Sequence, residues 1–351
     1  MIRVLVVDDS AVLRQSTRLI LESDPDLSVI GEARDGADAV SLVDRLKPDV
    51  ITMDLHMPKM DGLQAIEQIM AKHPAPIIVV TSANLDQELG LGLRASKCGA
   101  LSVLQRPARI AAPDYLAFTA KLIEQVKLMS TVKVVRRVRT SKPVPPDVAA
   151  KTPMPTRGSV KPEIVAIGSS TGGPAALHKI ISAIPADFPV PIVIVQHISF
   201  GFVQGLAEWL DAASPLRVKV AQPGEKVRPG TAYVAPDGDH MGVDRSNRIA
   251  LDPADPISGH RPSVTALFRS IARSYGASAI AAILTGMGAD GAIGMKALHD
   301  AGAFTLAQDE ASCVVFGMPK EAIALGAAQQ IVALDQIAPT LVALVAARVP
   351  V

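Results

Sequence analysis

Residues 2–22 read IRVLVVDDSAVLRQSTRLILE, an apolar run that ends in two acidic residues and leads into a helix-like stretch. The alternation continues to about residue 130, with the further apolar runs LSVIGEA, DVITMD, PIIVVTS and ALSVL. One intervening segment has the i, i+3, i+4, i+7 spacing of a helix face, at Ala39, Leu42, Val43 and Leu46. Five strands alternating with five helices, the fourth over Leu85–Cys98, predict a doubly wound, flavodoxin-like parallel sheet, because parallel strands need long crossover connections.

A second alternation runs from Glu163 onward, through EIVAIG, VPIVIVQ, LRVKVA, ASAIAAILTG and AFTLAQD. It predicts a second, mostly parallel α/β domain. The turn-rich stretches TAYVAPDGDHMGV and NRIALD predict hairpins inserted into its sheet. Residues 131–162 lack apolar periodicity and are rich in Pro, Lys and Arg, which favours a solvated linker over a binding tract. The expected domains are therefore residues 1–130 and 163–351.

Composition restricts the partners. Thirty-five basic against 34 acidic residues leave a formal net charge of +1, so no overall field draws the chain to nucleic acid or anionic lipid. The longest uncharged stretch, residues 188–207, contains two prolines and a histidine, which argues against membrane insertion. Cys98 and Cys313 are far apart in sequence, and no signal peptide is evident, so we expect a soluble protein in the reducing cytoplasm.

Carboxylates gather where two strands of the first domain end. Asp8 and Asp9 follow the first strand, Asp54 follows the third, and Thr81 ends the fourth. Each residue alone has an ordinary explanation, since Asp9 or Ser10 could cap a helix and Asp54 could begin a turn. Together they favour a site at one sheet edge where Mg²⁺ offsets the charge and an aspartate accepts a phosphoryl group.

A glycine-rich turn follows the first strand of the second domain. Residues 168–172 read GSSTG and match G-x-S-x-G, a turn that exposes a nucleophilic serine, here Ser170, beside a helix N-terminus. Nucleotide-binding alternatives fail, because the glycines do not fit G-x-G-x-x-G and Pro174 stands where a P-loop needs lysine.

Two further strand ends supply a base and an acid. His197 follows VPIVIVQ, and Asp290 follows ASAIAAILTG through GMGAD. Taken alone, His197 could be a hydrogen-bonded histidine at a strand end and Asp290 a helix N-cap. Their position on the same sheet edge as Ser170 favours a catalytic triad. The histidines and cysteines lack zinc-ligand spacing, and the order Ser, His, Asp differs from that of α/β-hydrolases.

The motifs VLVVDDSAVLRQ, MDLHMPKMDGLQA and VVTS resemble the receiver domain of two-component response regulators. The resemblance implies that Asp54 is the phosphoacceptor, that Asp8, Asp9 and the main-chain carbonyl of His56 hold Mg²⁺ with it, and that Thr81 is the switch hydroxyl. Receivers usually have Lys-Pro after the fifth strand. This chain has Arg106-Pro107, whose planar guanidinium differs from a compact ammonium and could alter coupling to the second domain.

The whole chain resembles the CheB-type protein-glutamate methylesterases of chemotaxis, through AIGSSTGGPAAL, IVQHISFGF, YVAPDGDHM, HRPSV, ILTGMGADGAIGM and AQDEASCVVFGMPKEAI. The resemblance implies Ser170 as nucleophile, His197 as general base and Asp290 as orienting acid, with Thr171 and Met287 beside them and a Met287 N–H directed at the oxyanion. Thr265 and Ala289 depart from residues frequent in the family, and we expect neither to touch the triad.

The resemblance further implies hydrolysis of glutamate methyl esters on methyl-accepting chemotaxis receptors, deamidation of receptor glutamines, and no cofactor for the esterase chemistry. It names a CheA-type histidine kinase as phosphodonor. We expect the unphosphorylated receiver to cover the Ser170 edge. A DNA-binding regulator would need a helix-turn-helix that the second half does not predict, and a catalytically idle adaptor would leave the triad residues unexplained.

Overall fold

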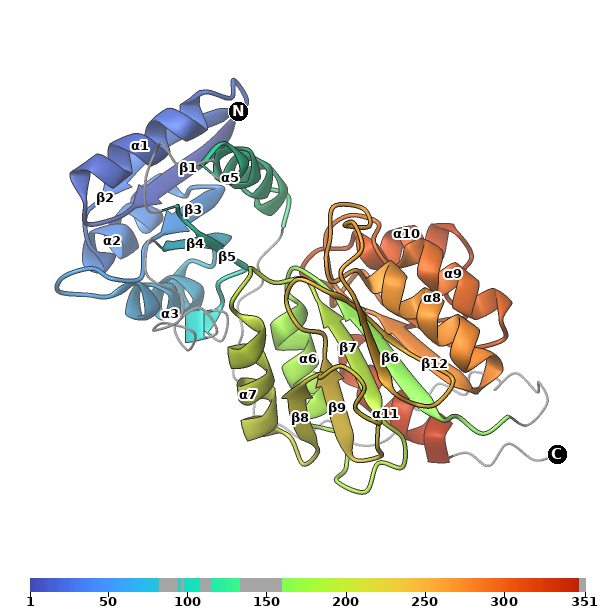
Figure 1. Cartoon of the computed structure of the whole chain (residues 1–351). Coiled ribbons are helices and arrows are strands. Elements are labelled where there is room, and N and C mark those ends of the chain that lie inside the picture. Colours follow the sequence, from blue (N-terminus) through green and yellow to red (C-terminus); the bar gives the residue numbers. More distant parts are fainter. Residues whose placement is uncertain (82–93, 96–97, 108–114, 133–159, 347–351) are drawn as a thin grey trace.

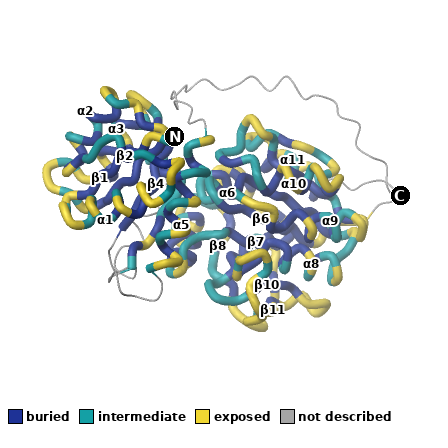
Figure 2. The backbone as a smooth tube through the Cα atoms, turned by 90° about the horizontal axis from the view of Figure 1, so that it is seen from above, coloured by how far each residue is buried: buried dark blue, intermediate teal, exposed yellow. Residues whose placement is uncertain are grey.

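The computed structural model describes residues 1–81, 94–95, 98–107, 115–132 and 160–346, and these form two α/β lobes (Figure 1). The expected linker lies mostly outside the described residues, as does most of the helix expected over Leu85–Cys98. Both lobes have buried sheets with exposed residues concentrated on their outer helices and turns (Figure 2). No helix in the described part of the chain is both long and apolar enough to cross a bilayer.

The N-terminal lobe holds a five-stranded sheet, all parallel, in the order β2-β1-β3-β4-β5. This is the order of flavodoxin-like folds, so the predicted fold class is confirmed. The strands are β1 (Ile2–Val7), β2 (Leu27–Ala33), β3 (Val50–Met53), β4 (Ile77–Thr81) and β5 (Ser102–Gln105). The helices described are α1 (Ala11–Glu22), α2 (Gly36–Leu46), α3 (Gly62–Lys72) and α5 (Tyr115–Met129).

Helices cover both faces of this sheet, with α2 and α3 on one side and α1 and α5 on the other. The helix starts agree with their sequence signals. Ser10 caps α1 by accepting the N–H of Leu13, and Asp61 forms a capping box with Gln64 at α3. Because Ser10 is the cap of α1, capping does not account for Asp9.

The C-terminal lobe holds a seven-stranded parallel sheet in the order β14-β13-β12-β6-β7-β9-β8. Its strands are β6 (Ile164–Ser169), β7 (Ile192–Gln196), β8 (Arg217–Val220), β9 (Thr231–Val234), β12 (Ala279–Ile283), β13 (Phe304–Gln308) and β14 (Gln330–Val332). The central strands are buried along their whole length and apolar up to the terminal Ser169 of β6 and Gln196 of β7, because both faces are covered.

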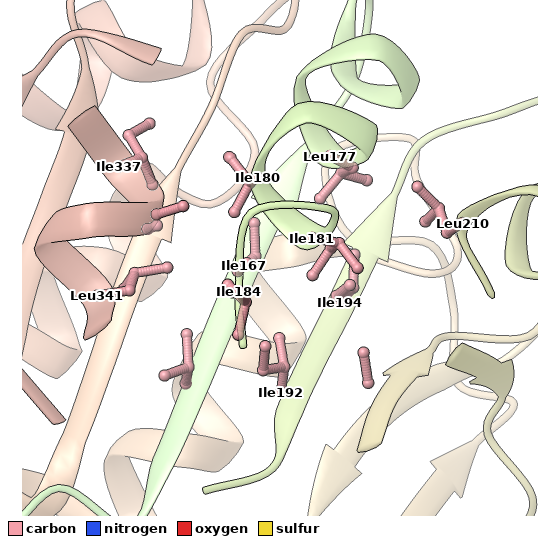
Figure 3. Close-up of a cluster of buried hydrophobic side chains, with 14 of the residues drawn as sticks. Ile167, Leu177, Ile180, Ile181, Ile184, Ile192, Ile194, Leu210, Ile337 and Leu341 are labelled. Carbon is pink, nitrogen blue, oxygen red and sulfur yellow. The ribbon is translucent and has the colours of Figure 1, made fainter. Parts of the chain in front are cut away.

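Three of the described helices pack on each face. One face carries α6 (Gly173–Ile181), α7 (Val203–Ala213) and α11 (Leu334–Ala346), whose side chains interdigitate with β6 and β7 (Figure 3). The other carries α8 (Val264–Ser274), α9 (Ala292–Asp300) and α10 (Met318–Ala324). The apolar runs did not predict α10, β14 or α11.

The turn-rich stretch divides in two. Its first part, TAYV, is β9, a parallel strand of the main sheet between β7 and β8. Its second part forms an antiparallel hairpin of β10 (His240–Val243) and β11 (Ile249–Asp252), a separate two-stranded sheet. The hairpin therefore packs beside the parallel sheet and does not interrupt it, and β10 lies against α8.

Candidate functional site

Three neighbouring strands at the centre of the C-terminal sheet deliver the expected triad residues. Ser170 follows β6, His197 follows β7, and Asp290 lies in the turn between β12 and α9. The chain leaves β6 toward β7 on one side and returns to β12 on the other, so this is a topological switch point, where open α/β sheets bind ligands. All three residues line one cavity.

The structure separates two adjacent serines. Ser169 is fully buried, and its hydroxyl donates to Oε1 of Gln196 at 2.6 Å. Nε2 of Gln196 in turn donates to the carbonyls of Ser170 and His197, both at 2.7 Å. Ser169 therefore holds the strand ends together, whereas Ser170 is the serine that faces the cavity.

Glycine is required where the chain turns from β6 into α6. Gly172 has a φ of +78°, in the left-handed region that favours glycine. A Cβ on Gly173 would lie 2.0 Å from Oε1 of Gln196. Any larger residue at position 173 would displace the side chain that holds Ser170 and His197.

His197 and Asp290 form a buried pair. Nε2 of His197 lies 2.9 Å from Oδ2 of Asp290, with side-chain exposures of 8% and 1%. The other ring nitrogen, Nδ1, is buried and has no hydrogen-bond partner among the described residues. The ring therefore has one nitrogen fixed by a carboxylate and the other left for an incoming proton.

The N-terminus of α8 holds Asp290. Oδ1 accepts from the Ser263 hydroxyl at 2.8 Å and from the Thr265 N–H at 3.1 Å, and Oδ2 accepts from the Val264 N–H at 2.7 Å. The expectation that Thr265 does not touch the triad residues was therefore wrong, because its place in the first turn of α8 directs its main-chain N–H at Asp290. Burial by itself would raise the pKa of Asp290, but the hydrogen bonds from His197, Thr265 and Ser263 outweigh it and lower that pKa. Asp290 is thus a carboxylate that stays ionised.

A second histidine covers the first. The rings of His260 and His197 are stacked, with centroids 3.9 Å apart and planes 6° from parallel. Burial, followed by the charge of His197, lowers the pKa of His260 to about 4. His260 is therefore neutral at physiological pH. It covers the His197–Asp290 pair without adding a charge next to it. Neither His260 nor Ser263 had a predicted role, although both lie in the motif HRPSV.

The N-terminal lobe gathers its own site. Carboxylate oxygens of Asp8, Asp9 and Asp54 lie within 4.8 Å of one another, at the carboxyl edge of β1 and β3. Burial, together with the charge of Asp8, raises the pKa of Asp54 to about 6. Three such hard oxygen donors, crowded and mutually repelling, form an acidic triad that is consistent with a Mg²⁺ site.

Arg106 reaches this cluster. Its Nη1 donates to Oδ2 of Asp8 at 3.2 Å, and its Nη2 donates to the Thr17 hydroxyl at 3.0 Å. Thr81 lies buried at the end of β4, and its carbonyl accepts the Arg106 N–H at 2.8 Å. The planar fork therefore bridges β1 and α1, with two partners that one ammonium group could not reach in the same geometry.

The triad cavity, of about 690 Å³, has walls from both lobes. Gln125 of α5 is buried with its Nε2 3.9 Å from the sulfur of Met287, and the Ser199 hydroxyl donates to the carbonyl of Val103 at 3.0 Å. Val314 and Val315 pack into the apolar cluster beneath α5. The N-terminal lobe thus lies across the edge that bears Ser170.

Comparison with known proteins assigns a family to each lobe. The response regulator receiver domain model matches residues 4–112, and the CheB methylesterase model matches residues 165–341. The bounds 1–130, 131–162 and 163–351 stay predictions.

Full-length relatives carry both parts. The chain is 46% identical, over 97% of its length and 96% of the relative's, to protein-glutamate methylesterase/protein-glutamine glutaminase 4 of Myxococcus xanthus. It is 48% identical to the Nitrosospira multiformis enzyme of that name, over 99% of this chain and 98% of the relative. The crystal structure of the Thermotoga maritima CheB methylesterase catalytic domain matches 53% of this chain and 100% of its own, with 43% identity and a TM-score of 0.51.

The two α/β lobes, the serine turn beside a buried His–Asp pair, and near-full-length similarity all agree. The chain belongs to the CheB family of receiver-regulated protein-glutamate methylesterase/protein-glutamine glutaminases, which act in chemotaxis.

Proposed function

We propose that Ser170, His197 and Asp290 form the catalytic triad of this enzyme, with Ser170 as nucleophile. The observation that carries the proposal is the state of the His197 ring. Its Nε2 is bound by Asp290, and its buried Nδ1 has no partner among the described residues, while Ser170 lines the same cavity. Nδ1 is then the nitrogen that takes the serine proton, with Asp290 fixing the tautomer and stabilising the imidazolium.

The proposed reaction proceeds in two halves. Oγ of Ser170 attacks the side-chain carbonyl carbon of a glutamate methyl ester as its proton moves to Nδ1 of His197. The tetrahedral intermediate collapses, the C–O bond to methanol breaks, and His197 protonates the leaving oxygen. Water then attacks the acyl carbon as its proton moves to Nδ1, the bond from that carbon to Oγ of Ser170 breaks, and His197 returns the proton to Oγ, which releases glutamate and restores the Ser170 hydroxyl. On a glutamine side chain the same steps release ammonia in place of methanol.

The oxyanion needs donors on the far side of the attacked carbonyl. Thr171 and Met287 both line the cavity beside Ser170, and we assign the main-chain N–H of Met287 to this task. The Thr285 hydroxyl donates to the Thr171 carbonyl at 2.9 Å and so fixes the turn. Removing one such donor costs about 3 to 4 kcal/mol of transition-state stabilisation in related sites.

Replacing Asp290 with asparagine is expected to lower kcat by about 10⁴-fold, as loss of tautomer control does in other triads. Both carboxylate oxygens accept main-chain N–H groups, from Val264 and Thr265. In either orientation of an asparagine side chain, its NH₂ group would therefore face one of these main-chain N–H donors. Methanol release measures the effect, and Asp300→Asn, an exposed change at the end of α9, is the matched control. Near-normal kcat in folded Asp290→Asn would remove Asp290 from the triad.

In the receiver, we propose that Asp54 accepts the phosphoryl group from a CheA-type histidine kinase. Asp8, Asp9, Asp54 and the carbonyl of His56 are the residues that would hold Mg²⁺, which when bound neutralises the incoming phosphoryl charge. Thr81 and Arg106 are the proposed switch residues. The proposed substrates are methyl-accepting chemotaxis receptors. Cytoplasmic location and the absence of nucleic-acid or membrane-inserting contacts stay predictions from the sequence.

Asp54→Asn is expected to abolish the rise in methanol release that a small-molecule phosphodonor and Mg²⁺ produce. The amide cannot form an acyl phosphate, and it removes one charge from the acidic cluster. Chelation of Mg²⁺ is expected to abolish the same rise in the unmodified protein. Asp44→Asn, an exposed change on α2, serves as control. A full response in Asp54→Asn would assign phosphorylation to another residue.

The proposed function is tested by methanol release from methylated receptor membranes, with and without phosphodonor. We expect release to require Ser170 and to rise with phosphodonor. Release that requires Ser170 but does not change with phosphodonor would support the triad. It would also show that phosphorylation is not coupled to activity, through Arg106 or through the contact between the lobes. Binding of receptors without release would favour an adaptor.

A further inference from the structure

A buried histidine outside the triad binds both ends of one loop that contacts His197 and Asp290. His240, at the start of β10, is 4% exposed. Its Nδ1 accepts the main-chain N–H of Ser263 at 3.1 Å, and its Nε2 lies 3.1 Å from the carbonyl oxygen of Asp255. Because an amide N–H only donates and a carbonyl only accepts, these partners require a neutral ring with its proton on Nε2.

The two hydrogen bonds of His240 fasten both ends of one loop. The loop runs from Asp255, after β11, to Ser263, the N-cap of α8. Within it, Ile257 and His260 exchange main-chain hydrogen bonds of 3.1 and 3.0 Å, so the loop is closed on itself. Nη1 of Arg261 reaches back to the carbonyls of Pro253 and Ala254, at 2.8 and 3.1 Å.

This loop delivers two contacts to the catalytic pair. Near its middle, His260 stacks on His197. At its end, the Ser263 hydroxyl and the following N–H groups hold Asp290. The base and the acid are thus both held by one segment, and His240 connects the ends of that segment.

The strand that carries His240 is itself fixed to α8. The Val243 N–H donates to the Ser270 hydroxyl at 3.1 Å, and the Ser274 hydroxyl donates to the Val243 carbonyl at 2.7 Å. A Cβ on Gly242 would lie 2.4 Å from the Ser270 oxygen, which shows how closely strand and helix approach. The imidazole of His240 is therefore a rigid spacer between the hairpin and the N-terminus of α8.

We propose that His240 is a positioning residue for the esterase reaction, which sets the N-terminus of α8, and with it Asp290 and His197, at the distance the chemistry needs. The inference rests on the proposed triad and adds a residue that touches no reacting atom. It predicts that the acceptor at the Nδ1 position matters more than the imidazole as such, because that acceptor holds Ser263.

Two amide substitutions in the full-length protein separate these roles. In His240→Asn the amide oxygen replaces Nδ1 and keeps the acceptor for Ser263. In His240→Gln the amide nitrogen replaces Nε2, which keeps the donor for Asp255 and loses that acceptor. We expect His240→Gln to lower kcat on the order of 10²-fold with little change in KM, since misplacement by about 1 Å has that cost, and His240→Asn to keep most of kcat.

The measurements are methanol release with phosphodonor, the thermal unfolding midpoint, and the low-field NMR resonance of the proton between His197 and Asp290. We expect that resonance to shift or broaden in His240→Gln and to stay in place in His240→Asn. His299→Asn, a half-exposed change in the last turn of α9, controls for loss of an imidazole.

Equal losses of kcat in both amide variants, in proportion to their unfolding midpoints, would overturn the inference and leave His240 a purely structural residue. If His240→Gln does not fold, the kcat of folded His240→Asn tests the inference, because a hundredfold loss of kcat in that variant would contradict the role of the acceptor. Failure of the triad itself would be recognised separately, by activity that survives Ser170→Ala.

Discussion

Replacing Ser170 with alanine is expected to lower kcat for methanol release by about 10⁵- to 10⁶-fold, the loss that follows removal of the nucleophile from other serine triads. Ser170 directly follows the central strand β6 and lines the same cavity as His197 and Asp290. Among the described residues, its hydroxyl has no assigned hydrogen bond that would give it a structural role. Without Oγ no acyl-enzyme forms, so release of methanol and of ammonia should fall together.

The neighbouring serine is the sharpest control. Ser169 is buried, and its hydroxyl is bound by Gln196, so Ser169→Ala should cost about 1 to 2 kcal/mol of unfolding free energy through the unpaired amide oxygen. It should nevertheless keep measurable turnover and label with a serine-reactive phosphonate. The assignment would be reversed if Ser169→Ala were the variant that lost labelling and Ser170→Ala kept it.

Opening the contact between the lobes is the second large effect. We expect Gln125→Arg to raise unstimulated methanol release by between about 5- and 150-fold, the range of typical coupling free energies between sites. Gln125 is buried against Met287 at the cavity, so an arginine there must either lose its hydration or separate α5 from the C-terminal lobe. Separation exposes the edge that bears Ser170.

Ala117→Arg, on the exposed face of the same helix, supplies the matched control and should leave unstimulated release unchanged. Phosphodonor should raise release in this control as in the unmodified protein, and add little in Gln125→Arg, because both changes act on one equilibrium between covered and open arrangements. Unchanged release in folded Gln125→Arg, with a full response to phosphodonor, would show that the contact does not restrain the enzyme.

Much of this molecule is predictable from local pattern. The strands over IRVLVV and LSVIGEA have the predicted bounds. The run PIIVVTS predicts β4, which is buried throughout, because a strand covered on both faces is a continuous apolar run. The parallel arrangement then follows from the intervening helices, and it places Asp8, Asp9 and Asp54 at one edge, as the structure confirms. TAYV was harder to assign, because a short strand between turn residues has the same pattern in a hairpin and in a parallel sheet.

Periodicity and motif spacing were sufficient to predict the fold class, the family and the three strand ends at which Ser170, His197 and Asp290 lie. The folded chain was needed to show which nitrogen of His197 binds Asp290, which of two adjacent serines is held by Gln196, and that Gln125 lies against Met287. No pattern along the sequence predicts the hydrogen bond between His240 and Ser263. Hydrogen bonds and lobe contacts depend on the direction of single side chains, and that direction is set by packing between distant segments, which local periodicity does not encode.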